Sequence, residues 1–389
     1  QELRQELSED FDAARAENRL RFYDGKILFP CRWKRSDGVP VELTLKPSTY
    51  DGRPWFLSFV DTNSRDQIQR PIQPGRQLES FAFLGSWNTF LSELADKALP
   101  EDWDFSSSSQ KDHYILIQYI KYTFYRLKRE NKVCISRDRQ FACFNTGLVD
   151  KHYDDIYACF VPNDPGSETE WKFSGFCTAA SRTLGKQIVN CFNPLPQPPR
   201  YFEHGEQLFY DANRALLTDF DHIIIDNISR LPVQFLYDQF TDCEGARTIV
   251  EELPTADFRR KRELYEQLKT IVSDNSRLFI RIQNRLKDSI ELAKKRVSRN
   301  YKTAIPSYYP KRNTMSLMLP LCLMDEETPN IALVVEQTEA GNYQGQTILT
   351  LPQAYVDARL LCQLNSEWLT TSKINSDEND EATEDITTE

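Results

Sequence analysis

The order of helical and strand-like segments is the feature that most constrains the fold of this chain. Strand character occurs in three blocks, at residues 26–62, 132–192 and 315–351. Helical periodicity occupies the first 20 residues and much of the sequence between the blocks. Blocks of strands separated by blocks of helices favour an α+β fold over a regular β-α-β alternation. We therefore predict a mixed or antiparallel sheet flanked by helices.

Shifts in composition divide the chain into regions. Residues 1–72 hold a polar helix and a small β-meander, whose runs are separated by the turn sequences SDG and TYDG. A linker with two prolines and a glycine follows, and a main α+β domain is predicted from 78 to 368. Residues 375–389 carry seven acids and no base, which is typical of a disordered acidic tail. The sequence shows no internal repeat.

Several local predictions refine the main domain. Asn145-Thr146-Gly147 is interpreted as a turn and residues 185–192 as a further strand. The segment NPLPQPPRYF is a connector, because proline lacks the N–H that helices and central strands need. Residues 209–226 and 255–300 are predicted to be helical, and Ser273 or Asp274 is expected to cap a second helix within the long run.

The cysteines and the apolar runs indicate the cellular setting. The chain has nine cysteines, an odd number, without a C-x-x-C pair, and most lie among apolar residues. This pattern is typical of reduced, buried thiols and makes a zinc site improbable. No apolar run approaches the roughly 18 residues of a membrane helix, and no secretory signal is visible after Gln1. We expect a soluble, cytoplasmic protein without metal or cofactor, and whether a domain precedes Gln1 stays open.

Charge is segregated along the chain. The formal net charge is -10, yet residues 258–312 carry 16 Lys and Arg against five Asp and Glu, a local balance of +11. On a helical wheel, Leu278, Ile282, Leu286, Ile290, Ala293 and Val297 fall within an arc of about 120°. The basic residues Arg277, Arg281, Arg285, Lys295 and Arg299 fall in a separate arc of about 80°. We therefore predict a helix with one basic edge.

The segment after that helix combines cations with aromatic rings. Its cations are Lys302, Lys311 and Arg312, and its rings are Tyr301, Tyr308 and Tyr309. A row of cations suits a polyanion, because each neutralised phosphate releases counterions, and tyrosine faces can stack on unpaired bases. The alternative is that the basic edge is simply solvated or pairs with the protein's own acids, and that the tyrosines are core residues.

Two clusters contain a histidine among acids. DKHYDD places His152 among Asp150, Asp154 and Asp155. DFDHIIID places His222 beside Asp219 and Asp221, with Asp226 one helical turn further on. Histidine with carboxylates suits general acid-base chemistry, although acid-rich turns are also common on surfaces. No phosphate loop, nucleophile elbow, H-E-x-x-H or deaminase motif is present.

Four segments carry a family resemblance. FAFLGSWNTFLSELADKALPEDW, FNTGLVDKHYDDIYACFVPN, LPLCL and YQGQTILTLPQAYVDARL resemble the family called domain of unknown function 3825, over about Leu78 to Leu364. The resemblance assigns no activity and no functional residue. Its members are sometimes found beside RNA-binding or RNA-processing domains, which by association favours a nucleic-acid role.

Three functions therefore stay open. The leading prediction is an RNA- or single-stranded nucleic-acid-associated protein that binds through residues 277–312. The alternatives are an enzyme acting on a nucleotide or RNA phosphate, as a hydrolase or phosphotransferase, and a protein-interaction adaptor. Oligomeric state and substrate are not predicted.

Overall fold

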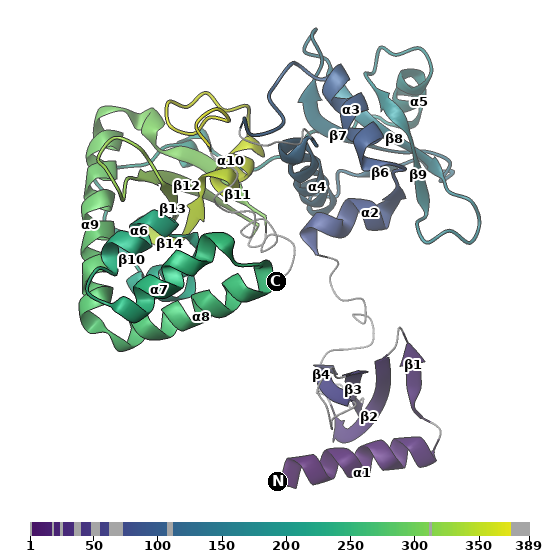
Figure 1. Ribbon diagram of the computed structural model, residues 1–389. Coiled ribbons are helices and arrows are strands. Elements are labelled where there is room, and N and C mark those ends of the chain that lie inside the picture. Colours follow the sequence, from purple (N-terminus) through teal and green to yellow (C-terminus); the bar gives the residue numbers. More distant parts are fainter. Residues whose placement is uncertain are drawn as a thin grey trace. The chain divides into compact units, whose positions relative to one another are not determined.

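The chain forms two compact units, Gln1–Ile72 and Gln73–Glu389 (Figure 1). The computed structural model describes residues 2–17, 19–23, 26–34, 40–47, 55–61, 73–106, 112–310 and 313–374. The predicted acidic tail lies outside these residues. Among the helices described, none combines the length and apolar character that a membrane span requires.

The first unit is a four-stranded antiparallel sheet with one helix packed on it. Strands β1 to β4 pair in chain order, and α1 contributes Ala14 to a core with Phe29 and Leu43. Arg32 on β2 donates to the Asp10 carboxylate at 2.9 Å, which fastens the polar helix to the sheet. The elements are α1 (Glu2–Ala16), β1 (Arg21–Tyr23), β2 (Lys26–Lys34), β3 (Pro40–Pro47) and β4 (Trp55–Asp61).

The second unit contains two five-stranded sheets. Sheet 1 has the strand order β5-β9-β8-β7-β6. It belongs to the first half of the unit, whose elements are η2 (Pro74–Arg76), α2 (Gln77–Phe81), β5 (Ala82–Phe83), α3 (Trp87–Lys97), α4 (Tyr114–Arg129), β6 (Cys134–Ile135), β7 (Ala142–Val149), β8 (Asp155–Pro162), β9 (Trp171–Cys177) and α5 (Leu184–Cys191).

Sheet 2 has the order β10-β14-β13-β12-β11 and belongs to the second half. The elements there are η3 (Gly205–Leu208), β10 (Leu216–Thr218), η4 (a π-helix, His222–Asp226), η5 (Ile228–Arg230), α6 (Val233–Gln239), α7 (Glu244–Glu252), η6 (Leu253–Thr255), α8 (Phe258–Asp274), α9 (Ser276–Arg299), η7 (Tyr301–Thr303), β11 (Ile305–Tyr309), β12 (Thr314–Leu321), β13 (Ile331–Gln337), β14 (Tyr343–Thr350) and α10 (Leu351–Arg359).

The two halves repeat one topology. In each sheet a short first strand pairs in parallel with the last strand, and the four later strands form an antiparallel meander. Each half inserts its long helix, α4 or α9, between the first strand and the meander, and a short helix follows the last strand. The sequence shows no repeat, so the resemblance between the halves lies in the order of pairing and not in the residues.

Alternation along the strands explains how the layers pack. On β13, Ala332 and Val334 face the core shared with sheet 1 and α4, whereas Leu333 faces the core under α8 and α9. On β8, Phe160 faces the shared core and Cys159 the opposite face, where α5 packs. Figure 1 shows α4 between the two sheets. Both faces of each sheet are covered, so the central strands read as nearly continuous apolar runs. The predicted α+β class is confirmed.

Three local predictions were wrong. Asn145, Thr146 and Gly147 lie within β7, where the pairing register with β8 shifts and Gly147 has φ +74°. Residues 184–191 form helix α5, not a strand, because one face packs on sheet 1 through Ile188. The predicted helix at 209–226 instead contains β10 and the π-helix, because β10 pairs with β14, a strand distant in sequence.

Candidate nucleic-acid interface

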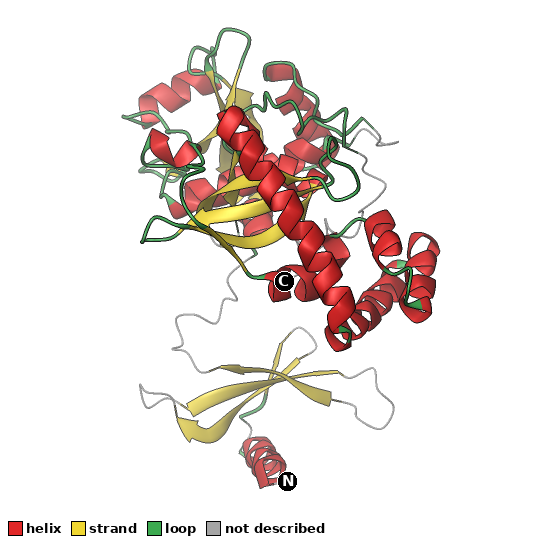
Figure 2. Ribbon diagram, turned by 90° about the vertical axis from the view of Figure 1, so that its left-hand side faces the viewer, coloured by secondary structure: helices red, strands yellow, loops and turns green. Residues whose placement is uncertain are grey.

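Helix α9 carries the predicted basic edge. Its N-terminal cap is Asn275, whose side-chain oxygen accepts hydrogen bonds from the N–H groups of Arg277 and Leu278. The prediction that Ser273 or Asp274 caps this helix was therefore wrong. An apolar stripe on α9 packs against sheet 2. In Figure 2, α9 is the long helix that crosses in front of this sheet. The stripe consists of the predicted residues Leu278, Ile282, Leu286, Ile290, Ala293 and Val297.

The middle of the basic edge is used inside the protein. Arg281 donates to the carbonyl oxygen of Gln239 at 2.7 Å and to the Asp242 carboxylate at 2.6 Å. Arg285 donates to the carbonyl oxygen of Leu323 at 2.7 Å. These two arginines hold α6 and the loop after β12 against α9, because guanidinium groups satisfy several acceptors at once. They are therefore poorly placed to contact a phosphate backbone.

The two ends of the edge remain exposed. Arg277 lies at the start of α9, and Lys295, Arg299 and Lys302 lie around its end. Within the described ranges, none of these four side chains forms an ion pair or a hydrogen bond with another side chain. The exposed cations therefore form two separate groups instead of a continuous row. Lys311 and Arg312 lie outside the described residues.

An exposed aromatic pair accompanies the cations at the end of α9. Tyr301 and Phe209 are 58% and 52% exposed, and their ring centroids lie 5.6 Å apart in an edge-to-face arrangement. Tyr301 is positioned by η7, where Asn300 accepts the N–H of Lys302 and the Thr303 carbonyl accepts the indole N–H of Trp368 at 3.0 Å. The surface made by Lys295, Arg299, Tyr301, Lys302 and Phe209 is called the α9-end surface below.

The other two tyrosines do not join this surface. Both belong to β11, an edge strand of sheet 2, where Tyr308 is fully buried and Tyr309 half-buried. Burial raises the pKa of Tyr308 to about 12. A ring with no exposed face cannot stack on a base, so the expectation that Tyr308 contacts nucleic acid is not supported by its position. The core interpretation holds for this residue.

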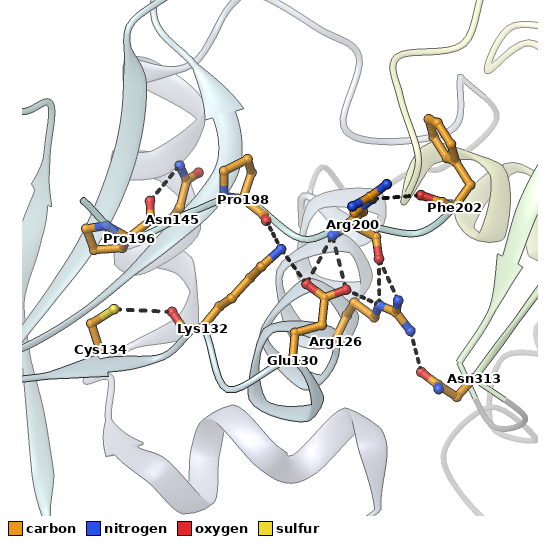
Figure 3. A network of polar contacts seen from close by, with 10 residues as sticks. All are labelled: Arg126, Glu130, Lys132, Cys134, Asn145, Pro196, Pro198, Arg200, Phe202 and Asn313. Atoms are coloured by element: carbon orange, nitrogen blue, oxygen red, sulfur yellow. Dashed lines mark hydrogen bonds and ion pairs between the residues drawn. The ribbon is translucent and has the colours of Figure 1, made fainter. Parts of the chain in front are cut away.

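Tyr308 instead packs under the guanidinium of Arg126. The polar contacts of Arg126 with Glu130, Arg200 and Asn313 tie the two halves together (Figure 3). Arg126, near the end of α4, lies over the rings of Tyr308 and Tyr201 at 5.4 and 5.8 Å. It also donates to Glu130 at 2.6 Å and to Asn313 at 2.7 Å. The Asn313 oxygen accepts a further hydrogen bond from the Tyr308 hydroxyl at 2.8 Å.

The same network fastens the proline-rich connector. The carbonyl oxygen of Arg200 accepts from Arg126 at 2.5 Å, and its N–H donates to Glu130. Lys132 donates to the Pro198 carbonyl at 2.8 Å and pairs with Glu130 at 2.7 Å. These contacts replace the backbone pairing that a proline-rich segment cannot make. The network is therefore structural, and its cations are already satisfied.

The DKHYDD cluster forms a tight turn between β7 and β8. The Asp150 carboxylate accepts the N–H groups of His152 and Asp154 at 2.7 and 3.1 Å, and these bonds lower its pKa against the opposing effect of desolvation. His152, Asp154 and Asp155 are exposed. An acid that caps its own turn is the structural arrangement expected of Asp. The geometry gives no chemical role to this histidine.

The DFDHIIID cluster does contain a His–Asp contact. His222 Nδ1 lies 2.8 Å from an Asp226 oxygen, and Nε2 lies 3.2 Å from the Asn227 amide nitrogen. Asp226, which the sequence placed one helical turn from His222, is thus the carboxylate that contacts the ring, and Asp221 is not. Both ring nitrogens have partners within the same turn, so these contacts account for the orientation of the ring.

The second unit contains a cavity of about 440 Å³, and neither histidine cluster lines it. Within the described part of the chain, no group of three or more His, Cys, Asp or Glu residues is arranged to hold a metal ion. All nine cysteines are free thiols.

Sequence reasoning missed Phe209 at the α9-end surface. It falls in a segment interpreted as helix, and its proximity to Tyr301 arises only from the tertiary structure. Its placement just after a proline-rich connector was the available signal, since exposed loops often carry binding residues.

Comparison with protein families matches residues 94–368 to the model described as domain of unknown function (DUF3825). This span is more than two thirds of the chain and includes the α9-end surface. No curated protein and no solved structure matches the chain.

Proposed function

Because the chain belongs to the DUF3825 family, whose description names no activity, we propose from geometry alone that it binds RNA or another single-stranded nucleic acid at the α9-end surface. The observation that carries the proposal is the exposed pair of Tyr301 and Phe209 beside three cations. A cytoplasmic setting belongs to the same proposal, supported by the nine free thiols, since such thiols persist in reducing compartments.

The aromatic pair supplies the contact that does not depend on base identity. Every base has a π-face, and stacking on an aromatic side chain is worth about 1–3 kcal/mol per base. Two large rings that are more than half exposed gain little from burial in the free protein. A strand whose bases are unpaired can cover them, whereas a duplex keeps its base faces stacked internally.

The cations supply the electrostatic contribution. Lys295, Arg299 and Lys302 are exposed and have no carboxylate partner among the described residues. If each neutralises one phosphate, the affinity for a single strand should follow a slope of about -2 on a log–log salt plot. That slope corresponds to a loss of roughly 20-fold between 50 and 200 mM salt.

Fluorescence anisotropy with a labelled oligouridylate of about 12 nucleotides tests the proposal. We expect the triple variant Lys295→Glu, Arg299→Glu, Lys302→Glu to lose measurable binding. The matched control reverses three charges elsewhere, with Arg259→Glu, Arg262→Glu and Arg277→Glu. These control positions are exposed. Arg259 and Arg262 lie at the start of α8, and Arg277 lies at the start of α9. The two helices diverge from the turn that joins the end of α8 to the start of α9 (Figure 1).

Aromatic variants separate stacking from charge. Tyr301→Ala and Phe209→Ala should each weaken binding at least fivefold without changing the salt slope, whereas Tyr301→Phe should keep the wild-type affinity. Equal loss in the matched charge control, or no salt dependence, contradicts the proposal. A protein partner bound at this surface independently of salt and nuclease would instead support the adaptor alternative.

A further inference from the structure

A cavity lies in the second unit where the segment after α3 meets the segment after α10. Its volume is about 440 Å³, within the range of roughly 300–1,000 Å³ that small-molecule sites occupy. Pro100, Leu364 and Leu369 supply an apolar part of the wall, and Gln363 and Thr371 supply polar groups. The cavity is therefore amphipathic, which suits a ligand with one polar end.

The charge of the cavity is set by two neighbouring acids. Glu101 accepts two hydrogen bonds from Arg359, at 2.5 and 2.7 Å, and both side chains are more than 90% buried. Glu101 is therefore neutralised. Asp102 is exposed, and among the described residues it accepts one long contact, from the Thr371 hydroxyl at 3.4 Å. Since neither Lys nor Arg is among the described residues that line the cavity, the wall carries one negative charge without a cationic partner there.

A buried phenol completes the polar end. Tyr355 is 5% exposed and lines the cavity, and its hydroxyl makes no hydrogen bond within the described part of the chain. Burial, with a smaller contribution from the nearby Glu101 and Asp102, raises the pKa of this phenol to about 12, so it is a neutral hydroxyl near pH 7. Although the ring is buried, the hydroxyl oxygen itself is open to solvent in the cavity, so a bound ligand would replace water at this position.

We propose that this cavity binds a small primary amine, with its ammonium on the Asp102 carboxylate and the Tyr355 hydroxyl oxygen. An ammonium has three donors and no acceptor, which matches acceptors on an acidic wall. Its hydrocarbon body lies along Leu364 and Leu369. A monoamine fits better than a diamine because Arg359 already pairs with Glu101. The proposal is independent of nucleic-acid binding.

Calorimetry on the wild-type full chain provides the first test. Hexylamine, 1-hexanol and hexanoate share a six-carbon body and differ in the charge of the end group. We expect hexylamine to bind at least tenfold more tightly than hexanol, and hexanoate not to bind. Equal affinity for the amine and the alcohol, or no binding of the amine, overturns the proposal.

Variants test the two named groups. Asp102→Asn should weaken hexylamine at least tenfold and leave hexanol unchanged, and Tyr355→Phe should weaken hexylamine roughly fivefold. Asp242→Asn changes the same group at an exposed site and should have no effect. Unchanged hexylamine affinity in a folded Asp102→Asn protein, checked by thermal melting, refutes the assignment. If a variant does not fold, the wild-type ligand series decides.

Discussion

The buried ion pair between Arg359 and Glu101 gives the most direct test of how the second unit is held together. The guanidinium makes two hydrogen bonds to the carboxylate, and the two side chains are 7% and 8% exposed. It also lies 5.0 Å from the Trp103 ring and 4.7 Å from the Tyr119 ring. The pair joins α10 to the segment after α3, residues that are far apart in the sequence.

The change Arg359→Met removes the charge and keeps an unbranched apolar side chain. Glu101 then remains buried without a partner, and such a loss costs about 3–5 kcal/mol. Folded proteins are stable by only about 5–15 kcal/mol, so this is a large fraction of the total. For a unit of this size the melting temperature should fall by roughly 4–8 °C.

Urea unfolding measures the effect. Replacing both partners, with Glu101→Gln and Arg359→Met together, should recover part of the loss, because no buried charge is left unpaired. The exposed pair of Arg281 and Asp242 is the control, and Asp242→Asn should cost less than about 1 kcal/mol. A cost below about 1 kcal/mol for Arg359→Met, or a double variant no more stable than the single one, would refute the reasoning.

Three further predictions concern stability. Gly185→Ala in α5 should destabilise the protein by about 1–3 kcal/mol, because a Cβ there would lie 2.5 Å from the Thr178 carbonyl oxygen. Gly245→Ala in α7 should stabilise it by about 0.4–1 kcal/mol, because a Cβ there meets nothing within 4 Å. Urea midpoints that shift in the same direction in both variants contradict this prediction. Asn275→Ala should cost about 1 kcal/mol through loss of the α9 cap, and unchanged thermal unfolding would argue against that role. Burial raises the pKa of several tyrosines to about 12, above about 10 for an exposed phenol. Their folded pKa exceeds the unfolded one, so the stability they contribute is present below pH 10 and lost as the pH rises towards 12. Urea midpoints and tyrosinate absorbance recorded from pH 9 to 12 check this, and titration near pH 10 in the folded protein would contradict it. The tyrosines are Tyr157, Tyr210, Tyr308 and Tyr355.

Local pattern predicted the elements whose signals are long and regular. The apolar stripe of α9 is the one expected from the helical wheel, and the strands from 315 to 350 lie where alternation and turn residues placed them. It failed for α5 and β10, which are short. Their state depends on partners elsewhere: α5 packs on sheet 1, and β10 exists because it pairs with β14.

The candidate sites depended more strongly on tertiary structure. Composition identified a basic, tyrosine-rich region, and Tyr301 and Tyr308 looked alike there. Packing made Tyr301 exposed beside Phe209 and buried Tyr308 under Arg126. The cavity could not be anticipated, because Asp102 and Tyr355 meet only when α10 docks near the segment after α3.

Sequence alone was sufficient to predict the α+β class, the amphipathic helix with its basic residues, and the membership of the family that the family model shows. These properties depend on residue types and on spacings of two to four residues, which a single chain displays directly. The folded structure was needed to tell which cations are free, which rings are exposed and where a cavity lies. Those properties depend on burial and on partners that the fold brings together from distant positions.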